Sequence, residues 1–258
     1  MPSILAKKLS RIFPLSDEEL SVLERAVATT RDFDRGEDLV QDGSRPSSCS
    51  LIMEGFACRY KVLPDGRRQI MSFLIPGDVC DLQSFILEKL DHNIGTLDAC
   101  RVGYLPHATV RDITEKYPRI ARAFWKDTLI EASAFREWLV SVGRRPAYTR
   151  MAHALCEIMV RLEAVGLTKN RSCRFPLTQL ELSDALGLSV VHVNRTLKRL
   201  RTAGLISLAA EVLTIHDWNG LAKAGEFDQA YLHLVATSPS ELIVTPANNA
   251  ANLRIRRN

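Results

Sequence analysis

Apolar residues within 177–206 recur at helical spacing in two short segments that are joined by one glycine. Thr178 stands three residues before Glu181, the pattern of a capping box, in which each side chain bonds the other residue's backbone N–H. Gly187 permits a sharp turn, and Ser189 is placed to cap the second segment. Apolar residues at i, i+4 and i+7 of the second segment share an inward face: Val193, Leu197 and Leu200. The pattern predicts a helix-turn-helix.

The other apolar residues of this region are predicted to form the core behind the two helices. Those of the first helix are Leu180, Ala185 and Leu186, and Leu188 lies between the helices. The polar and basic face of the second helix stays open and suits a major groove, because short side chains near its start can approach base edges and basic side chains can reach phosphates. The residues predicted to contact DNA are Thr178, Ser189, Val190, Val191, His192, Asn194, Arg195, Lys198, Arg199 and Arg201.

Two β-prone segments follow the second helix. Residues 204–208 and 212–215 flank Ala209-Ala210-Glu211, a pattern that predicts a small β-hairpin packed behind the second helix. A basic helix face by itself is often only solvated surface. The hairpin completes a winged helix, and this favours DNA binding over that alternative.

A different pattern, short strands separated by turns, occupies residues 30–117. Three glycines recur at intervals of eleven, at Gly55, Gly66 and Gly77. Alternating apolar residues at 56–62 are typical of a strand with one buried face. The pattern predicts an antiparallel β-roll, preceded by a short helix that begins at Ser16.

A helical pattern then extends from Pro118 to Gly143. Six of its residues step by four and three, as in the seam of a coiled coil: Phe124, Thr128, Glu131, Phe135, Trp138 and Val142. Because two of them are polar, a helix that packs only within its own chain is the alternative. We predict instead that this seam pairs with a second copy of the chain in a homodimer.

These patterns divide the chain into four parts. We expect a β-roll sensor domain with its N-terminal helix at 1–117, a dimerisation helix and hinge at 118–145, a winged helix-turn-helix at 146–236, and a disordered tail rich in Asn, Ala and Arg at 237–258. The fold class is therefore α+β.

Composition and charge agree with two domains of different character. The 258 residues carry a net charge of +4, yet residues 144–215 hold eleven Lys and Arg against five Asp and Glu. Such a local excess fits a DNA reader joined to a near-neutral sensor, whereas membrane or heparin binders show denser basic runs. No signal core or membrane-length apolar stretch is present, so we expect a cytoplasmic protein with no membrane partner.

Cysteine and histidine positions give no framework for a cofactor. The six cysteines form no C-x-x-C pair, and in a reducing compartment we expect packed free thiols. The six histidines never fall at metal-ligand spacing, so no metal site is assigned.

The order of parts, with several specific motifs, resembles the cyclic-AMP receptor and fumarate-nitrate regulator (Crp/Fnr) family of bacterial transcription factors. The motifs are Pro76-Gly77-Asp78, Arg150-Met151-Ala152, Leu186-Gly187-Leu188-Ser189 and Val193-Asn194-Arg195-Thr196-Leu197. The resemblance implies an N-terminal roll of the cupin-like, cyclic-nucleotide-binding type. It also implies a homodimer on palindromic double-stranded DNA, RNA polymerase as a partner, no enzymatic activity and an effector pocket in the roll. That pocket is assigned to Asp78, Cys80, Leu82 and Leu90.

The resemblance also suggests roles within the second helix. Arg195 matches the family's base-contacting arginine, and arginine can bond guanine bidentately. Val191 stands where many relatives carry a glutamate, so it is expected to favour a thymine methyl. Lys198, Arg199 and Arg201 are expected to bind phosphates and to add affinity without sequence choice.

Two departures from the family argue against its best-known effectors. Cyclic-nucleotide binders hold the phosphate with an arginine, since a buried anion needs a paired cation, and the segment 78–96 contains no arginine. We therefore predict no response to cyclic AMP. An iron–sulfur cluster needs closely spaced thiolates near the N-terminus, but no cysteine precedes Cys49.

Other functions stay open at this stage. Haem could bind through Cys80, His92 or Pro2, and a thiol switch could use Cys49, Cys58, Cys80 or Cys100. A nucleotide-binding sensor with a vestigial DNA domain is a further alternative. A cupin-like metal enzyme would need converging His and carboxylate ligands, which the roll lacks.

Overall fold

Two antiparallel sheets form the N-terminal roll in the computed structural model, which describes residues 3–235. Their strand orders are β1-β7-β3 and β2-β6-β4-β5. The strands are β1 (Thr29–Phe33), β2 (Asp38–Val40), β3 (Ser48–Glu54), β4 (Ala57–Val62), β5 (Arg68–Leu74), β6 (Asn93–Thr96) and β7 (Cys100–Pro106). Ile52, Ile94 and Val102 belong to one buried cluster, because alternate residues of β3, β6 and β7 face the same interior. The predicted roll is confirmed.

Four short helices flank the roll. They are α1 (Ile4–Ser10), α2 (Asp17–Glu24), α3 (Ser84–Leu87) and α4 (His107–Lys116). Ser16 caps α2 in a capping box with Glu19, so this helix begins where the sequence predicts.

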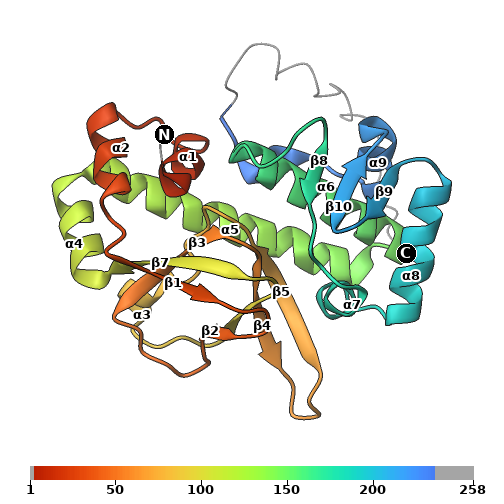
Figure 1. The fold of residues 1–258 in the computed structure, drawn as a ribbon, viewed down its shortest axis with the longest axis horizontal. Helices are drawn as coiled ribbons and strands as arrows, with labels where there is room; N and C mark the ends of the chain where they lie inside the picture. Colours follow the sequence, from red (N-terminus) through yellow and green to blue (C-terminus); the bar gives the residue numbers. More distant parts are fainter. Residues whose placement is uncertain (1–2, 236–258) are drawn as a thin grey trace, which may run out of the picture.

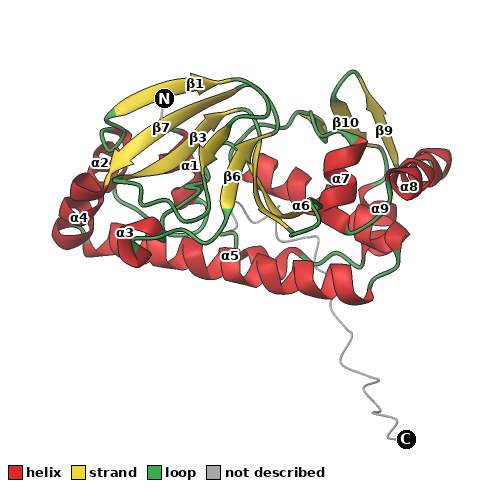
Figure 2. Ribbon diagram, turned by 90° about the horizontal axis from the view of Figure 1, so that it is seen from below, coloured by secondary structure: helices red, strands yellow, loops and turns green. Residues whose placement is uncertain are grey.

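The long helix α5 (Pro118–Arg144) joins the two halves of the molecule. Figure 2 shows the roll over the first part of α5 and the C-terminal helices over its last part. Pro118 stands in its first turn, where a missing N–H costs nothing. Ile120, Ala123 and Phe124 are buried against the roll side of the molecule.

The C-terminal domain is a winged helix-turn-helix. Its elements are α6 (Ala147–Ala164), β8 (Ser172–Arg174), α7 (Gln179–Leu186), α8 (Val190–Thr202), β9 (Ile206–Ala209), β10 (Val212–Ile215), α9 (Trp218–Gly225) and the 3-10 helix η1 (Gln229–Leu232). The predicted hairpin is β9–β10, and β8 extends it to a sheet of order β8-β10-β9. Three-residue β8 was not expected, because so short a strand shows no alternation.

One predicted core position of the helix-turn-helix is wrong. Leu180 is 57% exposed, whereas Leu182 is fully buried. The buried stripe of α7 is Leu182, Ala185 and Leu186, at i, i+3 and i+4. Leu180 stands in the first turn and off this stripe, so it faces solvent.

Charged residues bind the two domains to each other. Arg68 Nε on β5 lies 2.8 Å from an Asp184 carboxylate oxygen on α7, and Arg35 lies 2.6 Å from Glu181 on the same helix. These pairs dock the first helix of the helix-turn-helix on the roll (Figure 1). The tail predicted to be disordered, 237–258, lies outside the described residues.

Candidate functional site

The second helix of the helix-turn-helix, α8, presents an open basic face. Its N-cap Ser189 accepts a hydrogen bond at Oγ from the His192 backbone N–H, at 3.3 Å. Val193, Leu197 and Leu200 are buried as predicted. The outward side chains are Val190, Val191, His192, Asn194, Arg195, Lys198, Arg199 and Arg201, and all are exposed.

The turn between α7 and α8 is held in place by several contacts. Gly187 has φ +61°, a left-handed conformation that glycine adopts without steric cost. The Arg150 guanidinium donates to the Leu186 carbonyl. Thr178 and Glu181 form the predicted capping box, and Thr178 is exposed at the start of α7. These contacts fix the turn and thereby the orientation of α8 relative to α7.

The basic residues of α8 differ in what they contact. Arg195 makes no ion pair or hydrogen bond with another described residue. The acids that could have held it, Glu181 and Asp184, pair instead with Arg35 and Arg68 of the roll. The Arg199 guanidinium lies over the Tyr148 ring, 4.6 Å from its centroid. Arg195 is thus available to a ligand, while Arg199 is partly anchored.

The wing projects beside this helix. Ala210 and Glu211 have φ +48° and +58°, values required by the tight two-residue turn of a β-hairpin. Arg174 on β8 pairs with Asp98 of the roll and with Glu211 at 3.3 Å. The wing is therefore also tied to the roll.

The predicted seam of α5 is divided between two surroundings. Phe124 is buried in the chain's own core, Glu131 pairs with Arg59, and Trp138 packs edge-on against Phe73 with centroids 5.7 Å apart. The other seam residues are exposed: Thr128, Phe135 and Val142. Three of the six seam residues thus have partners within the chain, and three are exposed.

A second apolar stripe of α5, missed from the sequence, is more exposed. It consists of Trp125, Leu129, Leu139 and Val140, which are 67%, 53%, 75% and 47% exposed. Trp125 and Leu129 are four residues apart, and Leu139 and Val140 lie on the same side of the helix about three turns later, roughly a third of a turn from the predicted seam. Spacing alone does not tell which of two apolar stripes faces the protein's own core.

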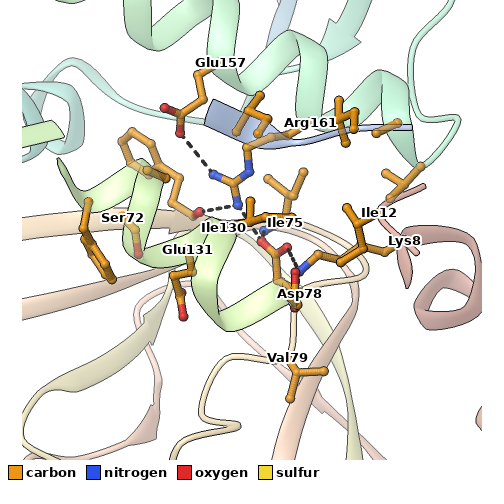
Figure 3. A pocket seen from close by; sticks show the side chains of 18 of the residues that line it. Lys8, Ile12, Ser72, Ile75, Asp78, Val79, Ile130, Glu131, Glu157 and Arg161 are labelled. Carbon is orange, nitrogen blue, oxygen red and sulfur yellow. Dashed lines mark hydrogen bonds and ion pairs between the residues drawn. The ribbon is translucent and has the colours of Figure 1, made fainter. Parts of the chain in front are cut away.

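A cavity of about 100 Å³ lies where α1, β5, α5, α6 and η1 meet. Figure 3 shows its charged group, in which Asp78 bonds both Lys8 and Arg161. The Lys8 Nζ to Asp78 distance is 2.9 Å, and Arg161 lies 2.7 Å from Asp78 and 3.4 Å from Glu157. Despite its burial, Asp78 has a lowered pKa, because the neighbouring Lys8 and Arg161 cations favour its charged form.

Only part of the predicted effector pocket reaches this cavity. Asp78 lines it. Cys80 and Leu90 are packed in the hydrophobic cluster of the roll, and Leu82 packs against a separate cluster beneath α1. The structure therefore does not bring the four residues together around one space.

Arg59 on β4 is the functional candidate that the sequence reasoning missed. Its side chain is 3% exposed and lines the cavity. Nε donates to the Cys80 carbonyl at 2.9 Å, and a terminal nitrogen reaches Ser72 at 3.4 Å and Glu131 of α5. The segment 78–96 contains no arginine, whereas β4 of the roll supplies one.

The thiols have the environment of packed core residues. All six cysteines are buried. Burial raises the pKa of Cys49, Cys58 and Cys100 to about 12, and it raises the pKa of Cys80 well above its usual value. Since the thiolate is the reactive form, this environment disfavours a thiol switch.

The candidate haem ligands that the structure describes are enclosed or already paired. His92 is buried and its Nδ1 lies 2.8 Å from Asp91, Cys80 is enclosed in the roll core, and Pro2 lies outside the described residues. Within residues 3–235, no group of three or more His, Cys, Asp or Glu is placed to hold a metal ion. No described helix is long and apolar enough to cross a membrane.

Comparisons with known proteins agree with this architecture. Residues 30–117 match the model of the cyclic nucleotide-binding domain, and residues 149–224 match that of the Crp-like helix-turn-helix domain. The solved structure of FixK2 from Bradyrhizobium japonicum is similar with a TM-score of 0.70 and 24% identity, over 77% of this chain and 97% of that one.

Two curated relatives have related names. A protein of Rhizobium leguminosarum bv. viciae, named a probable transcriptional activator, is 30% identical over 75% of this chain and 79% of its own length. An anaerobic regulatory protein of Haemophilus influenzae is 24% identical over 86% of each chain. With an exposed recognition helix on a winged domain, a long connecting helix and an N-terminal roll, the chain belongs to the Crp/Fnr family of DNA-binding transcription regulators.

Proposed function

We propose that this regulator binds a palindromic operator as a homodimer and reads bases with the N-terminal part of α8. The observation that carries the proposal is the open face of α8, where Arg195 is exposed and has no partner among the described residues. An arginine in this position can bond guanine O6 and N7. The neighbouring Val190 and Val191 are exposed apolar groups, suited to thymine methyls.

The remaining basic side chains of α8 are assigned to phosphates. Lys198 and Arg201 lie further along the helix and are exposed, so they contribute affinity and salt dependence without choosing a sequence. The Arg199 guanidinium stacks on Tyr148, so this side chain has less freedom to reach the phosphates of the DNA backbone. Thr178, Ser189, His192 and Asn194 complete the proposed contact surface from the two helix starts.

The dimer interface is assigned to the exposed stripe of α5. A run of large apolar side chains on one helix face is an unusual surface for a monomer. Two copies of this face can pair around a two-fold axis and cover each other's apolar side chains. The resulting dimer presents two recognition helices, one for each half-site of a palindrome. The exposed seam residues Thr128, Phe135 and Val142 border this stripe and are retained in the proposed interface. The other three seam residues, Phe124, Glu131 and Trp138, are not retained.

We further propose that the roll does not respond to cyclic AMP. The segment 78–96 offers no arginine, and the buried Arg59 of the roll is already paired with Glu131. The cavity of about 100 Å³ is also small beside the 300–1,000 Å³ of pockets that enclose drug-sized ligands, the size class of a nucleotide. RNA polymerase is proposed as a second partner, because two relatives are named as transcriptional activators. The role assigned to the chain is regulation and not catalysis.

The test is selection of operators from a random duplex pool, followed by footprinting. The proposal expects an enriched two-fold symmetric sequence, with protection of two half-sites about one helical turn apart, roughly 34 Å. A matched selection with cyclic AMP at millimolar concentration should enrich the same sequence, and the protein should bind it with the same affinity. Enrichment of no common sequence would contradict the proposal.

A further inference from the structure

We propose that the cavity beside Arg59 is a binding site for a small carboxylate with an apolar body, which exchanges with the Glu131 side chain. This inference deepens the proposed function, because it names the chemical class of an effector for the regulator. The two groups concerned come from different units: Arg59 from β4 of the roll and Glu131 from α5.

The two partners of this ion pair differ in their freedom to move. The Arg59 side chain is 3% exposed and is fixed by the Cys80 carbonyl and Ser72, whereas the Glu131 side chain is 33% exposed. A buried guanidinium always needs an anion or other acceptors, because uncompensated burial of a charge is costly. Glu131 can turn toward solvent at little cost, so a carboxylate from solution can replace it.

The other charges at the cavity are held more firmly. Lys8 pairs with both Asp78 and Asp127 at 2.9 Å, and Arg161 pairs with Asp78 and with Glu157, whose side chain is 1% exposed. Figure 3 shows Glu131 directed away from this group. The Arg59–Glu131 pair is therefore separate from that network, and exchange of its carboxylate leaves the network intact.

The residues that line the cavity indicate the chemistry of the ligand beyond its carboxylate. Ile75, Ile130, Phe135 and Trp138 line it with apolar surface, which favours an aliphatic or aromatic body. A cavity of about 100 Å³ is somewhat smaller than the engineered 150 Å³ cavity that holds benzene. The space vacated by the Glu131 carboxylate adds room for the carboxylate of the ligand, so the class is that of benzoate or a branched short-chain acid.

Replacement of Glu131 by the ligand at Arg59 affects the DNA-binding domain through α5. Glu131 leaves the roll when the ligand binds, and Trp138, one cavity wall, donates from its indole nitrogen to Glu157 of α6 at 3.1 Å. The same helix carries the proposed dimer stripe. Ligand binding thus removes one bond between the roll and the helix that positions both recognition units.

The test is titration calorimetry of the full chain with benzoate, without DNA, on Glu131→Gln, Arg59→Met and the wild type. Glu131→Gln removes the competing carboxylate, so benzoate should bind it at least about tenfold more tightly than the wild type. Arg59→Met should lose binding. Benzamide, which is neutral, should gain nothing from Glu131→Gln, and the exposed control Glu115→Gln should match the wild type.

Three outcomes would overturn the inference: equal benzoate affinity in the wild type and Glu131→Gln, no binding of benzoate, acetate or isobutyrate by Glu131→Gln at millimolar concentration, or retained binding by Arg59→Met. Circular dichroism checks that each variant is folded. If Arg59→Met does not fold, the comparison of Glu131→Gln with the wild type decides alone. Because DNA is absent from the titration, failure here is distinct from failure of operator binding, which the selection measures separately.

Discussion

Arg68 of the roll and Asp184 of the helix-turn-helix are joined by an ion pair of 2.8 Å, so the sensor domain and the DNA-reading platform are directly bonded. Both side chains are partly solvated, at 31% and 19% exposure. Solvent screening limits such a pair to about 1 kcal/mol or less. A double-mutant cycle with Arg68→Ala and Asp184→Ala in urea unfolding should give a coupling energy in this range. A coupling of zero would mean that the pair does not hold the domains together.

The burial of α7 predicts a sharp contrast between two neighbouring leucines. Leu182→Ala should lower the free energy of unfolding by about 2–5 kcal/mol, because it opens a cavity in the core of the DNA-binding domain. Leu180→Ala should change it by less than about 0.5 kcal/mol, since that side chain is 57% exposed. Equal losses for the two variants in urea unfolding would contradict the observed orientation of the helix.

Asp81 should make the stability of the roll depend on pH. Burial raises its pKa to about 6, although the Ser50 backbone N–H and hydroxyl donate to the carboxylate. Because the folded pKa lies above the unfolded value of 3.8, the folded state binds the proton more tightly between these values. This contribution to stability is present at low pH and is lost as the pH rises through about 6.

Asp81→Asn should remove this dependence. Relative to the variant, the wild type should lose up to about 3 kcal/mol of unfolding free energy between pH 4 and pH 7. The measurement is urea unfolding of both proteins across this range. A constant difference between them would show that Asp81 titrates equally in the folded and unfolded chains.

If the exposed stripe of α5 forms the dimer interface, a charge placed on it should disrupt the dimer. Leu139→Glu places a charge on the most exposed residue of that stripe, and sedimentation should then show a monomer at micromolar concentration where the wild type is a dimer. Val62→Glu, on the exposed end of β4, is the matched control and should stay dimeric. A dimeric Leu139→Glu protein would place the interface elsewhere.

The sequence predicts the helix-turn-helix closely because several local signals agree there. Caps at Thr178 and Ser189, the glycine turn and the i, i+4, i+7 stripe each require the same element boundaries. The order of roll, long helix and winged domain follows from changes in the spacing of apolar residues, which are equally local. These features depend on residues near one another in the chain.

What the sequence does not reveal depends on contacts between distant residues. Arg59 and Glu131 are 72 positions apart, and Arg35 and Glu181 are 146 apart, so their pairing follows from the docking of whole units. The orientation of α5 has the same origin, because the roll and α6 cover one of its two apolar stripes. Local periodicity carries no information on that choice.

The central claim, that α8 reads bases through Arg195, is tested most directly by fluorescence anisotropy on the selected operator and on a random duplex. Arg195→Ala should lose about 5- to 150-fold of the preference for the operator, equivalent to 1–3 kcal/mol. Lys198→Ala should weaken both duplexes alike and reduce the salt dependence by about one unit of slope. The exposed control Lys61→Ala should match the wild type. If Arg195→Ala keeps the full preference of the wild type for the operator, the assignment of this residue as the base reader is wrong.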